Sequence, residues 1–215
     1  MALSFWASVV GRMIAVIDYK AGNLTSVVKA LRFLGADDVV VTQSPEDVLR
    51  ADKIVLPGVG HFQATQLLDN LGLTTATREA VTKGAPFLGI CVGLQWLYEG
   101  STEAPGTAGL GHFAGQCERF PAVFEGAELK SPHVGWNSLE DVRGDSRLLR
   151  GVTPGSFVYY THSWRAQISG DTAATTMYGG AFTGAVERGN VMGVQFHPEK
   201  SAETGLKVLK NFLEL

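Results

Sequence analysis

The sequence predicts a single-domain α/β fold, in which a mixed, largely parallel sheet is flanked by helices. Through the N-terminal half, short continuous apolar runs alternate with stretches of helical periodicity, which is typical of strands covered on both faces of a parallel sheet. Beyond about residue 110 short β-rich runs dominate, so we expect the sheet to be mixed. A chain of 215 residues is long enough to bury one sizeable core.

Four strands are predicted in the N-terminal half, each a short apolar run that ends at a turn-forming residue. Between the first two, apolar residues recur at helical spacing over 24–34, and Gly35 is placed where a helix stops. Ser44 and Pro45 are the residue types of an N-cap and a first helical position. A further helical stretch ends at Lys83-Gly84. The strand runs are 14–17, 39–41, 53–56 and 87–90.

The C-terminal half is predicted to contain four more β-rich runs and a closing helix. The segment 187–190, Glu-Arg-Gly-Asn, has the residue types of a hairpin turn between the last two runs. Apolar residues at helical spacing, from Leu206 to Leu213, predict a helix over 202–213. The β-rich runs are 134–139, 156–160, 181–187 and 191–196.

Composition excludes several classes of function. A formal net charge of -3 carries no basic excess, so we expect no nucleic-acid partner. No apolar segment approaches the ~18 to 20 residues of a membrane span, so we expect no membrane association. Only two cysteines are present, Cys91 and Cys117, which favours a reducing cytoplasm over a disulfide framework. We expect Cys117 to be a buried packing residue.

Cys91 lies in a pattern typical of a nucleophile elbow. Gly89-Ile90-Cys91-Val92-Gly93 follows a predicted strand, and small flanking residues let the strand and the next helix pack closely below the thiol. The helix start would direct free N–H groups at the sulfur, which favours the thiolate. The N–H of Val92 would face a developing oxyanion. A buried structural cysteine between two packing glycines is the alternative.

Near the C-terminus, a histidine and a carboxylate lie two residues apart. Pro198 biases His197 towards an extended backbone, in which residues i and i+2 point the same way. Glu199 can therefore lie beside the imidazole and fix its tautomer, as the third member of a catalytic triad does. Taken alone, the pair also fits a surface turn with a solvated His and Glu.

Two further features fit a site around Cys91, the 57–60 segment and Gln95. Pro57-Gly58-Val59-Gly60 follows a strand, and N–H groups of Gly58 and Val59 could supply the other oxyanion donor, although a plain turn fits the same spacing. It is not a phosphate loop, because the Gly-Lys-Ser/Thr ending is absent. Gln95 lies one helical turn from Cys91 and can reach the same pocket. Glu103 by itself is typical of a solvated loop charge.

Together these motifs resemble the class I, triad-type glutamine amidotransferases, whose fold is a flavodoxin-like sandwich. Within that class the resemblance is strongest to the glutaminase subunits of imidazole glycerol phosphate synthase, and it runs from about residue 13 to the C-terminus. Val59 in the glycine loop and Lys200 after His-Pro-Glu favour this group over other members of the class. The motifs are Asp18-Tyr19-x-x-Gly22-Asn23, 57–60, 89–95, Pro132-His133-Val134-Gly135-Trp136-Asn137, Tyr160-Thr161-His162-Ser163-Trp164 and Phe196-His197-Pro198-Glu199-Lys200-Ser201.

The resemblance implies hydrolysis of L-glutamine. Cys91 would attack the side-chain amide to give a glutamyl thioester and ammonia, with His197 as base and then acid and Glu199 orienting it. Gln95 and Glu103 match positions that hold the substrate glutamine. Glu103 would bind the α-amino group of that substrate. The family implies no cofactor, and the five histidines show no metal-ligand spacing beside cysteines.

The resemblance also implies a partner, since nothing in the chain looks like a site for the synthase's nucleotide substrate. Ammonia would pass through a channel to a cyclase subunit in a cytoplasmic heterodimer, which makes imidazole glycerol phosphate and AICAR in histidine biosynthesis. Glutaminase activity is expected to stay low until the cyclase is loaded. The residues expected at this contact and in coupling are Asn23, Trp136, Asn137 and Lys200, although core packing is the other interpretation of the aromatic residues.

The implied domain covers residues 13–215, and residues 1–12 are expected to be an N-terminal extension, either an alternative start or non-native sequence. Trp96 departs from the family pattern, because a smaller aliphatic residue is more familiar there. The alternatives are the glutaminase subunit of another amidotransferase, such as anthranilate or aminodeoxychorismate synthase, a cysteine peptidase or hydrolase, and a scaffold with a vestigial site.

Overall fold

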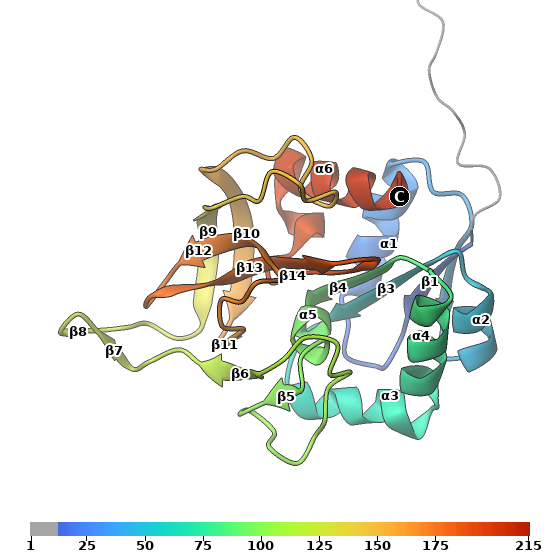
Figure 1. The fold of residues 1–215 in the computed structure, drawn as a ribbon, viewed down its shortest axis with the longest axis horizontal. Helices are drawn as coiled ribbons and strands as arrows, with labels where there is room; N and C mark the ends of the chain where they lie inside the picture. The colour runs from blue at the N-terminus through green and yellow to red at the C-terminus, as the bar shows by residue number, and fades with distance from the viewer. Residues whose placement is uncertain (1–12) are drawn as a thin grey trace, which may run out of the picture.

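The main sheet confirms the predicted fold class. The computed structural model describes residues 13–215, so the extension predicted for residues 1–12 lies outside the described residues. The sheet strands are β1 (Ile14–Ile17), β2 (Val39–Thr42), β3 (Lys53–Gly58), β4 (Phe87–Cys91), β12 (Thr172–Met177), β13 (Ala181–Arg188) and β14 (Val191–Val194). Their order is β12-β13-β14-β4-β3-β1-β2 (Figure 1). The five strands from β14 to β2 are parallel, and β12 and β13 add an antiparallel end.

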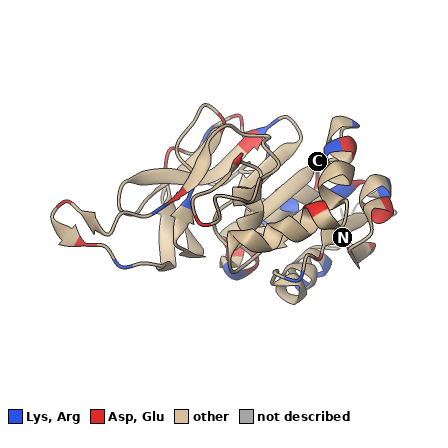
Figure 2. Cartoon of the chain, turned by 90° about the horizontal axis from the view of Figure 1, so that it is seen from below, with Lys and Arg blue, Asp and Glu red and all other residues tan. Residues whose placement is uncertain are grey.

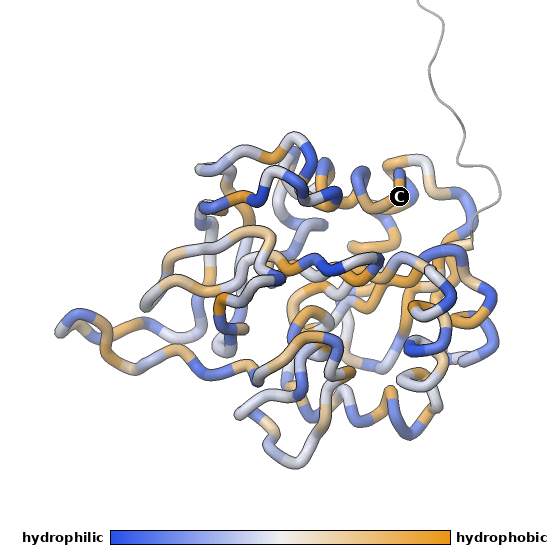
Figure 3. Tube along the Cα trace, viewed as in Figure 1, coloured by the Kyte–Doolittle hydropathy of each residue, from blue (hydrophilic) through white to orange (hydrophobic). Residues whose placement is uncertain are grey.

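Helices cover both faces of this sheet. On one side lie α1 (Leu24–Phe33) and α6 (Ala202–Leu213); on the other lie α3 (Gln66–Asn70), α4 (Leu73–Thr82) and α5 (Val92–Trp96) (Figure 1). The remaining helix, α2 (Pro45–Arg50), packs against α4. The central strands carry the most hydrophobic part of the chain (Figure 3), and β1, β3, β4 and β14 are buried along their whole length. Continuous apolar strands were therefore a valid sign of a doubly covered sheet.

The predicted helix ends are confirmed where they rest on local chemistry. Gly35 follows α1 at φ +91°, a left-handed conformation that suits glycine. Ser44 caps α2 by accepting a hydrogen bond from the Asp47 N–H, and Pro45 is the first helical residue. The helical stretch before Lys83-Gly84 is divided into η1 (Phe62–Thr65), α3 and α4, with Gly72 at φ +72° before α4.

Strand β3 continues two residues beyond its predicted end. Its pairing with β1 stops at Val55, but its pairing with β4 runs through Pro57 and Gly58, which lies opposite Cys91. Proline is tolerated there because this part of the strand has lost one of its two neighbours. The consequence is that the glycine loop begins directly beside the cysteine.

A second group of strands lies beside the β12 end of the sheet. Strands β9 (His133–Leu139) and β10 (Ser156–His162) form an antiparallel pair and confirm two predicted runs. Strand β14 ends at Val194, two residues before its prediction, and β12 was not predicted. Short strands also escaped prediction, because two to four residues show no periodicity. They are β5 (Gly100–Ser101), β6 (Gln116–Arg119), β7 (Val123–Phe124), β8 (Ala127–Glu128) and β11 (Trp164–Arg165).

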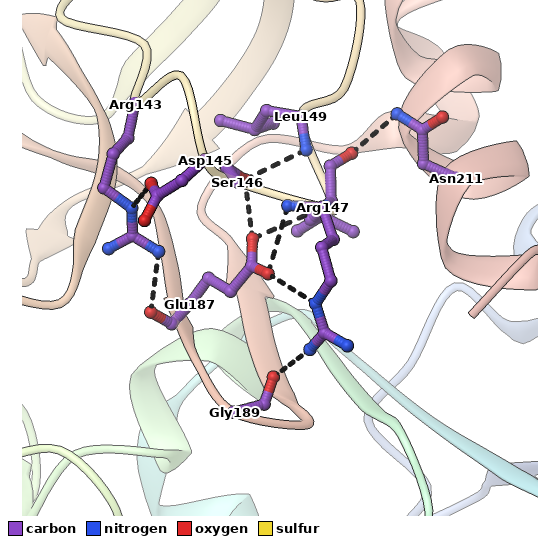
Figure 4. A network of polar contacts seen from close by, with 9 residues as sticks. Arg143, Asp145, Ser146, Arg147, Leu149, Glu187, Gly189 and Asn211 are labelled. Atoms are coloured by element: carbon purple, nitrogen blue, oxygen red, sulfur yellow. Dashed lines mark hydrogen bonds and ion pairs between the residues drawn. The ribbon is translucent and has the colours of Figure 1, made fainter.

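A buried carboxylate anchors the loop between β9 and β10. Glu187 of β13 accepts hydrogen bonds from the Ser146 hydroxyl at 2.6 Å, from the backbone N–H groups of Arg147 and Leu148, and from the Arg147 guanidinium at 3.3 Å (Figure 4). Arg143 donates to the Glu187 backbone carbonyl. Both carboxylate oxygens are therefore satisfied, which offsets the cost of burying a charge.

Charged side chains are dispersed over the molecule. Lys and Arg lie among Asp and Glu on the helices and loops in the view of Figure 2. Within residues 13–215, every helix is too short or too polar to cross a bilayer.

Candidate active site

The candidate site lies at the carboxyl ends of the central parallel strands, where ligands of open α/β sheets usually bind. Strand β3 ends at Gly58, β4 ends at Cys91, and the segment after β14 leads to His197. A cavity of about 240 Å³ opens at this edge. Five predicted site residues line it, namely Val59, Cys91, Val92, Gln95 and Glu103, and so does the 161–164 segment, from the end of β10 to the start of β11.

Cys91 has the strained backbone of a nucleophile elbow. Its φ is +56°, which a non-glycine residue rarely adopts, and it is the last residue of β4, directly before the first turn of α5. A Cβ on Gly89 would lie 2.4 Å from the Gly93 carbonyl oxygen, and a Cβ on Gly93 would lie 1.9 Å from the Leu56 carbonyl oxygen. Only glycine fits at either position, so the sequence pattern around Cys91 reflects close packing of strand and helix.

His197 and Glu199 form a buried pair. The His197 Nδ1 and the Glu199 Oε1 lie 2.9 Å apart, and their side chains are 1% and 0% exposed, which excludes the solvated surface turn. His197 is extended, as predicted, but Glu199 is not: it lies in the 3₁₀ turn η2 (Pro198–Lys200). The contact is made by a turn that folds the carboxylate back onto the ring, so the predicted i, i+2 alignment along an extended strand was wrong.

The charges of this pair support each other. Burial alone lowers the pKa of His197, but interactions with Cys91 and Glu199 more than offset it and raise that pKa to about 10. Burial raises the pKa of Glu199, but the hydrogen bond and charge of His197 lower it by a larger amount. The net pKa of Glu199 is therefore below its usual range. Asn23 Nδ2 also donates to Glu199 Oε1 at 3.1 Å. Among the described residues, His197 Nε2 and Glu199 Oε2 have no hydrogen-bond partner although both are buried.

The three residues predicted to supply oxyanion donors, Gly58, Val59 and Val92, have different surroundings. Val92 begins α5 and lines the cavity. The Val59 N–H donates to the Ala21 carbonyl at 2.7 Å. The prediction of a free donor at Val59 is therefore not met in this conformation, because a carbonyl of the segment after β1 already uses that N–H. Gly58 is tightly enclosed, since a Cβ there would lie 2.2 Å from the Tyr19 hydroxyl oxygen.

The predicted glutamine-contacting residues both lie at the cavity. Gln95 Nε2 donates to the Trp164 carbonyl at 2.9 Å and to Gln195 Oε1 at 3.3 Å. Glu103 Oε2 accepts the Phe62 N–H at 2.9 Å, at the start of η1, so it is a positioned carboxylate rather than a solvated charge. Nothing in the described part of the chain groups three or more His, Cys, Asp or Glu side chains as metal ligands would be grouped.

The residues expected at a partner contact are divided between the surface and the site. Trp136 is 53% exposed on β9, and Lys200 is exposed with its Nζ 5.9 Å from the centre of the Tyr159 ring. Asn137 hydrogen bonds to the Met177 carbonyl and to His133. Asn23 points instead to Glu199, so in this structure it supports the buried pair.

Gln195 is a site residue that the sequence analysis missed. It is fully buried, and its Nε2 lies 3.7 Å from the Cys91 sulfur as a donor. It precedes His197 by two residues, and that spacing is the signal that could have found it. Cys117, the other cysteine, is buried and free, as expected, with its thiol directed at the Gln95 carbonyl.

The fold and the site belong to a known class. Residues 15–215 match the family model described as glutamine amidotransferase class-I, and the chain belongs to this family. The structure of PurLQS from Thermotoga maritima has a similar fold, with a TM-score of 0.70 at 19% identity, covering 94% of this chain and 98% of that one.

Two relatives that align with this chain over nearly their whole length belong to one group within the family. The imidazole glycerol phosphate synthase subunit HisH of Bacillus cereus (strain G9842) is 43% identical over 202 residues, which cover 93% of both chains. The HisH subunit of Moorella thermoacetica is 45% identical over 207 residues, which cover 95% of both chains. Within the class-I family, the chain is a member of the group of HisH subunits.

Proposed function

We propose that this chain is the glutaminase subunit of an imidazole glycerol phosphate synthase, which hydrolyses L-glutamine to glutamate and ammonia. The observation that carries the proposal is one group of side chains: a thiol on a strained elbow that lines the cavity, and a buried His–Glu pair whose imidazole interacts with that thiol. A nucleophile, a base and an orienting carboxylate are the groups that acyl transfer from an amide needs. The identity of 43–45% to HisH subunits supports this particular synthase.

In the proposed reaction, the Cys91 thiolate attacks the side-chain amide carbon of glutamine and forms a tetrahedral intermediate. His197, held protonated by its raised pKa, gives its Nε2 proton to the departing nitrogen. Ammonia is released, and a glutamyl thioester remains on Cys91. His197 then takes a proton from water, which attacks the thioester and releases glutamate. Glu199 keeps the proton of Nδ1 in place and stabilises the imidazolium throughout.

Gln95 and Glu103 are proposed to hold the substrate. Both N–H groups of the Gln95 amide are used by protein acceptors, which leaves its Oε1 as the acceptor available to a ligand in the cavity. Glu103 presents a carboxylate at the same cavity, fixed by the Phe62 N–H, and would bind the α-amino group of glutamine.

The oxyanion loop is proposed to keep activity low in the isolated chain. Val92 supplies one N–H, while the Val59 N–H is held by Ala21. Losing one such donor typically costs about 10²- to 10³-fold in kcat. A partner that draws the Val59 N–H away from Ala21 would complete the oxyanion site, so glutaminase turnover would rise when a loaded cyclase binds.

The proposed partner is the cyclase subunit, in a cytoplasmic heterodimer. One face of the β9–β10 pair exposes Val134, Trp136 and Phe157, with exposures of 56%, 53% and 58%, and Lys200 lies beside it. Large exposed apolar residues gathered on one face are typical of a protein interface. At the inner end of the same strands, the Thr161 carbonyl lies 4.0 Å from the Cys91 sulfur, so ammonia formed there would have a short route through an interface channel.

The test is ammonia release from L-glutamine by the chain alone and with a cyclase subunit plus its nucleotide ligand. We expect strong stimulation by the loaded cyclase and its loss in Cys91→Ala. The matched control is Cys117→Ala, which removes the other buried thiol and should retain turnover. Equal turnover with and without the cyclase would reject the proposal that the cyclase stimulates glutaminase activity. An inactive wild type in both conditions would reject the glutaminase itself.

A further inference from the structure

A continuous chain of hydrogen bonds crosses the space between β9 and the cavity. Asn137 Nδ2 and His133 Nε2 are 3.3 Å apart, His133 Nδ1 and His162 Nε2 are 3.3 Å apart, and His162 Nδ1 lies 2.9 Å from the Trp164 carbonyl oxygen. The same carbonyl accepts the Gln95 amide. The sequence motifs 132–137 and 160–164, which the proposed reaction does not use directly, thus meet at a residue proposed to bind glutamine.

The acceptor at the inner end fixes every proton in this chain. A carbonyl oxygen can only accept, so the proton of His162 is on Nδ1 and its Nε2 is an acceptor. His133 must then donate from Nδ1, and its Nε2 accepts from the Asn137 amide. The second N–H of that amide donates to the Met177 carbonyl, and its oxygen accepts the Ser138 N–H. One arrangement of donors and acceptors satisfies all of these contacts.

The surroundings keep both rings neutral. Burial lowers the pKa of His162 to about 3 and that of His133 to about 4. His133 is also stacked between two aromatic rings, with centroid distances of 4.0 Å to Tyr178 and 4.9 Å to Tyr160. A neutral ring held between two others cannot rotate freely, so its hydrogen-bond direction is retained.

The inner end of the chain touches the groups around the nucleophile. Trp164 offers its carbonyl to both His162 and Gln95, and Gln95 in turn contacts Gln195, whose amide donates to the Cys91 sulfur. A shift of the Trp164 carbonyl would rotate the Gln95 amide and move the oxygen that faces the cavity. The orientation of one proposed substrate contact therefore depends on His162, which shares its carbonyl acceptor and also lines the cavity.

We infer that His162 and His133 are positioning residues for glutamine binding: as Nδ1-protonated neutral rings they hold the Trp164 carbonyl, and through it the Gln95 amide, in the orientation that receives the substrate. This inference rests on the proposed function. It assigns these residues to substrate affinity, since neither ring is needed for proton transfer by the Cys91–His197–Glu199 set.

Two substitutions of His162 separate positioning from packing. The amide nitrogen of asparagine lies near the position of Nδ1, so His162→Asn keeps a donor to Trp164 and loses the acceptor for His133. The amide of glutamine reaches the position of Nε2, so His162→Gln keeps the His133 contact and loses the donor to Trp164. Each variant removes one hydrogen bond from the same buried site, so a purely structural role predicts equal effects.

We expect His162→Gln to raise the KM for glutamine about tenfold, the effect of one lost hydrogen bond, with kcat changed less than about threefold. His162→Asn should keep KM within about threefold of the wild type. His112→Asn, at a half-buried histidine that does not line the cavity, is the control for the substitution itself. Equal KM values for the two His162 variants, or an unchanged KM in His162→Gln, would overturn the inference.

The tautomers give a second test that needs no turnover. In ¹⁵N spectra of histidine-labelled protein, the ring nitrogens of His133 and His162 should both show the proton on Nδ1, with assignments from single His→Asn variants. A proton on Nε2 of either ring would overturn the inference even if the chain hydrolyses glutamine. Loss of wild-type glutaminase activity with the Nδ1 tautomers present would instead reject the proposed function and leave the chain of hydrogen bonds standing.

Discussion

Two buried glutamates, Glu187 and Glu199, have opposite surroundings. Glu187 accepts four hydrogen bonds on its two oxygens, all from the loop between β9 and β10 (Figure 4). Glu199 receives His197 and Asn23 on Oε1, and its Oε2 is buried without a partner among the described residues. Both carboxylates are nearly inaccessible to solvent.

The difference indicates what each carboxylate does. A buried charge with every lone pair satisfied stabilises the fold locally, and Glu187 ties a long loop to β13. A buried charge left partly unsatisfied costs free energy, and such groups are concentrated at functional sites. The Glu199 carboxylate is tolerated because it stabilises a protonated His197, so its value lies in the chemistry more than in the fold.

The largest effect expected from this comparison is the loss of activity in Glu199→Gln. Without the carboxylate charge the imidazolium of His197 is less stable, and the amide can present an N–H to Nδ1, so kcat should fall about 10³- to 10⁴-fold. The free energy of unfolding should fall less than in Glu187→Gln. Glutamine turnover measured beside Glu187→Gln, the same chemical change at the other site, is the check. A comparable fall in both variants would remove the distinction between the two carboxylates.

A smaller effect of the opposite kind is expected in Glu187→Gln. The amide replaces an acceptor oxygen with a donor that faces the donors of Ser146, Arg147 and Leu148, so the free energy of unfolding should fall by about 2–4 kcal/mol. Urea unfolding measures it, with the exposed Glu118→Gln as a control that should stay within about 0.5 kcal/mol. An unfolding midpoint equal to that of the control would show that the network contributes nothing.

The sequence predicted those features whose cause is local. The strained turn at Cys91 is visible because Gly89 and Gly93 are required by close packing within a few residues. The contact between His197 and Glu199 was predicted, although the turn that makes it was not. The engagement of the Val59 N–H could not be predicted, because its acceptor lies in the segment after β1, about forty residues earlier. The same holds for the short strands and for the anchoring of Glu187, which depend on how distant segments pair.

The smallest expected effect is on the pH dependence of stability. It distinguishes the carboxylates of Glu187 and Glu199 without a measurement of activity. The pKa of His197 is raised from 6.5 to about 10 in the folded chain, so the folded state holds more protons between those values. Its stabilising contribution is therefore fully present below pH 6.5 and is lost as the pH rises towards 10. Cys91 raises this pKa most and Glu199 supplies the rest, so Glu199→Gln should lose less stability between pH 6.5 and 9.5 than the wild type does. Glu187→Gln should follow the wild-type slope, since Glu187 does not contact the imidazole. Urea unfolding at the two pH values measures the difference, and parallel slopes in all three proteins would mean that Glu199 does not hold the proton on His197.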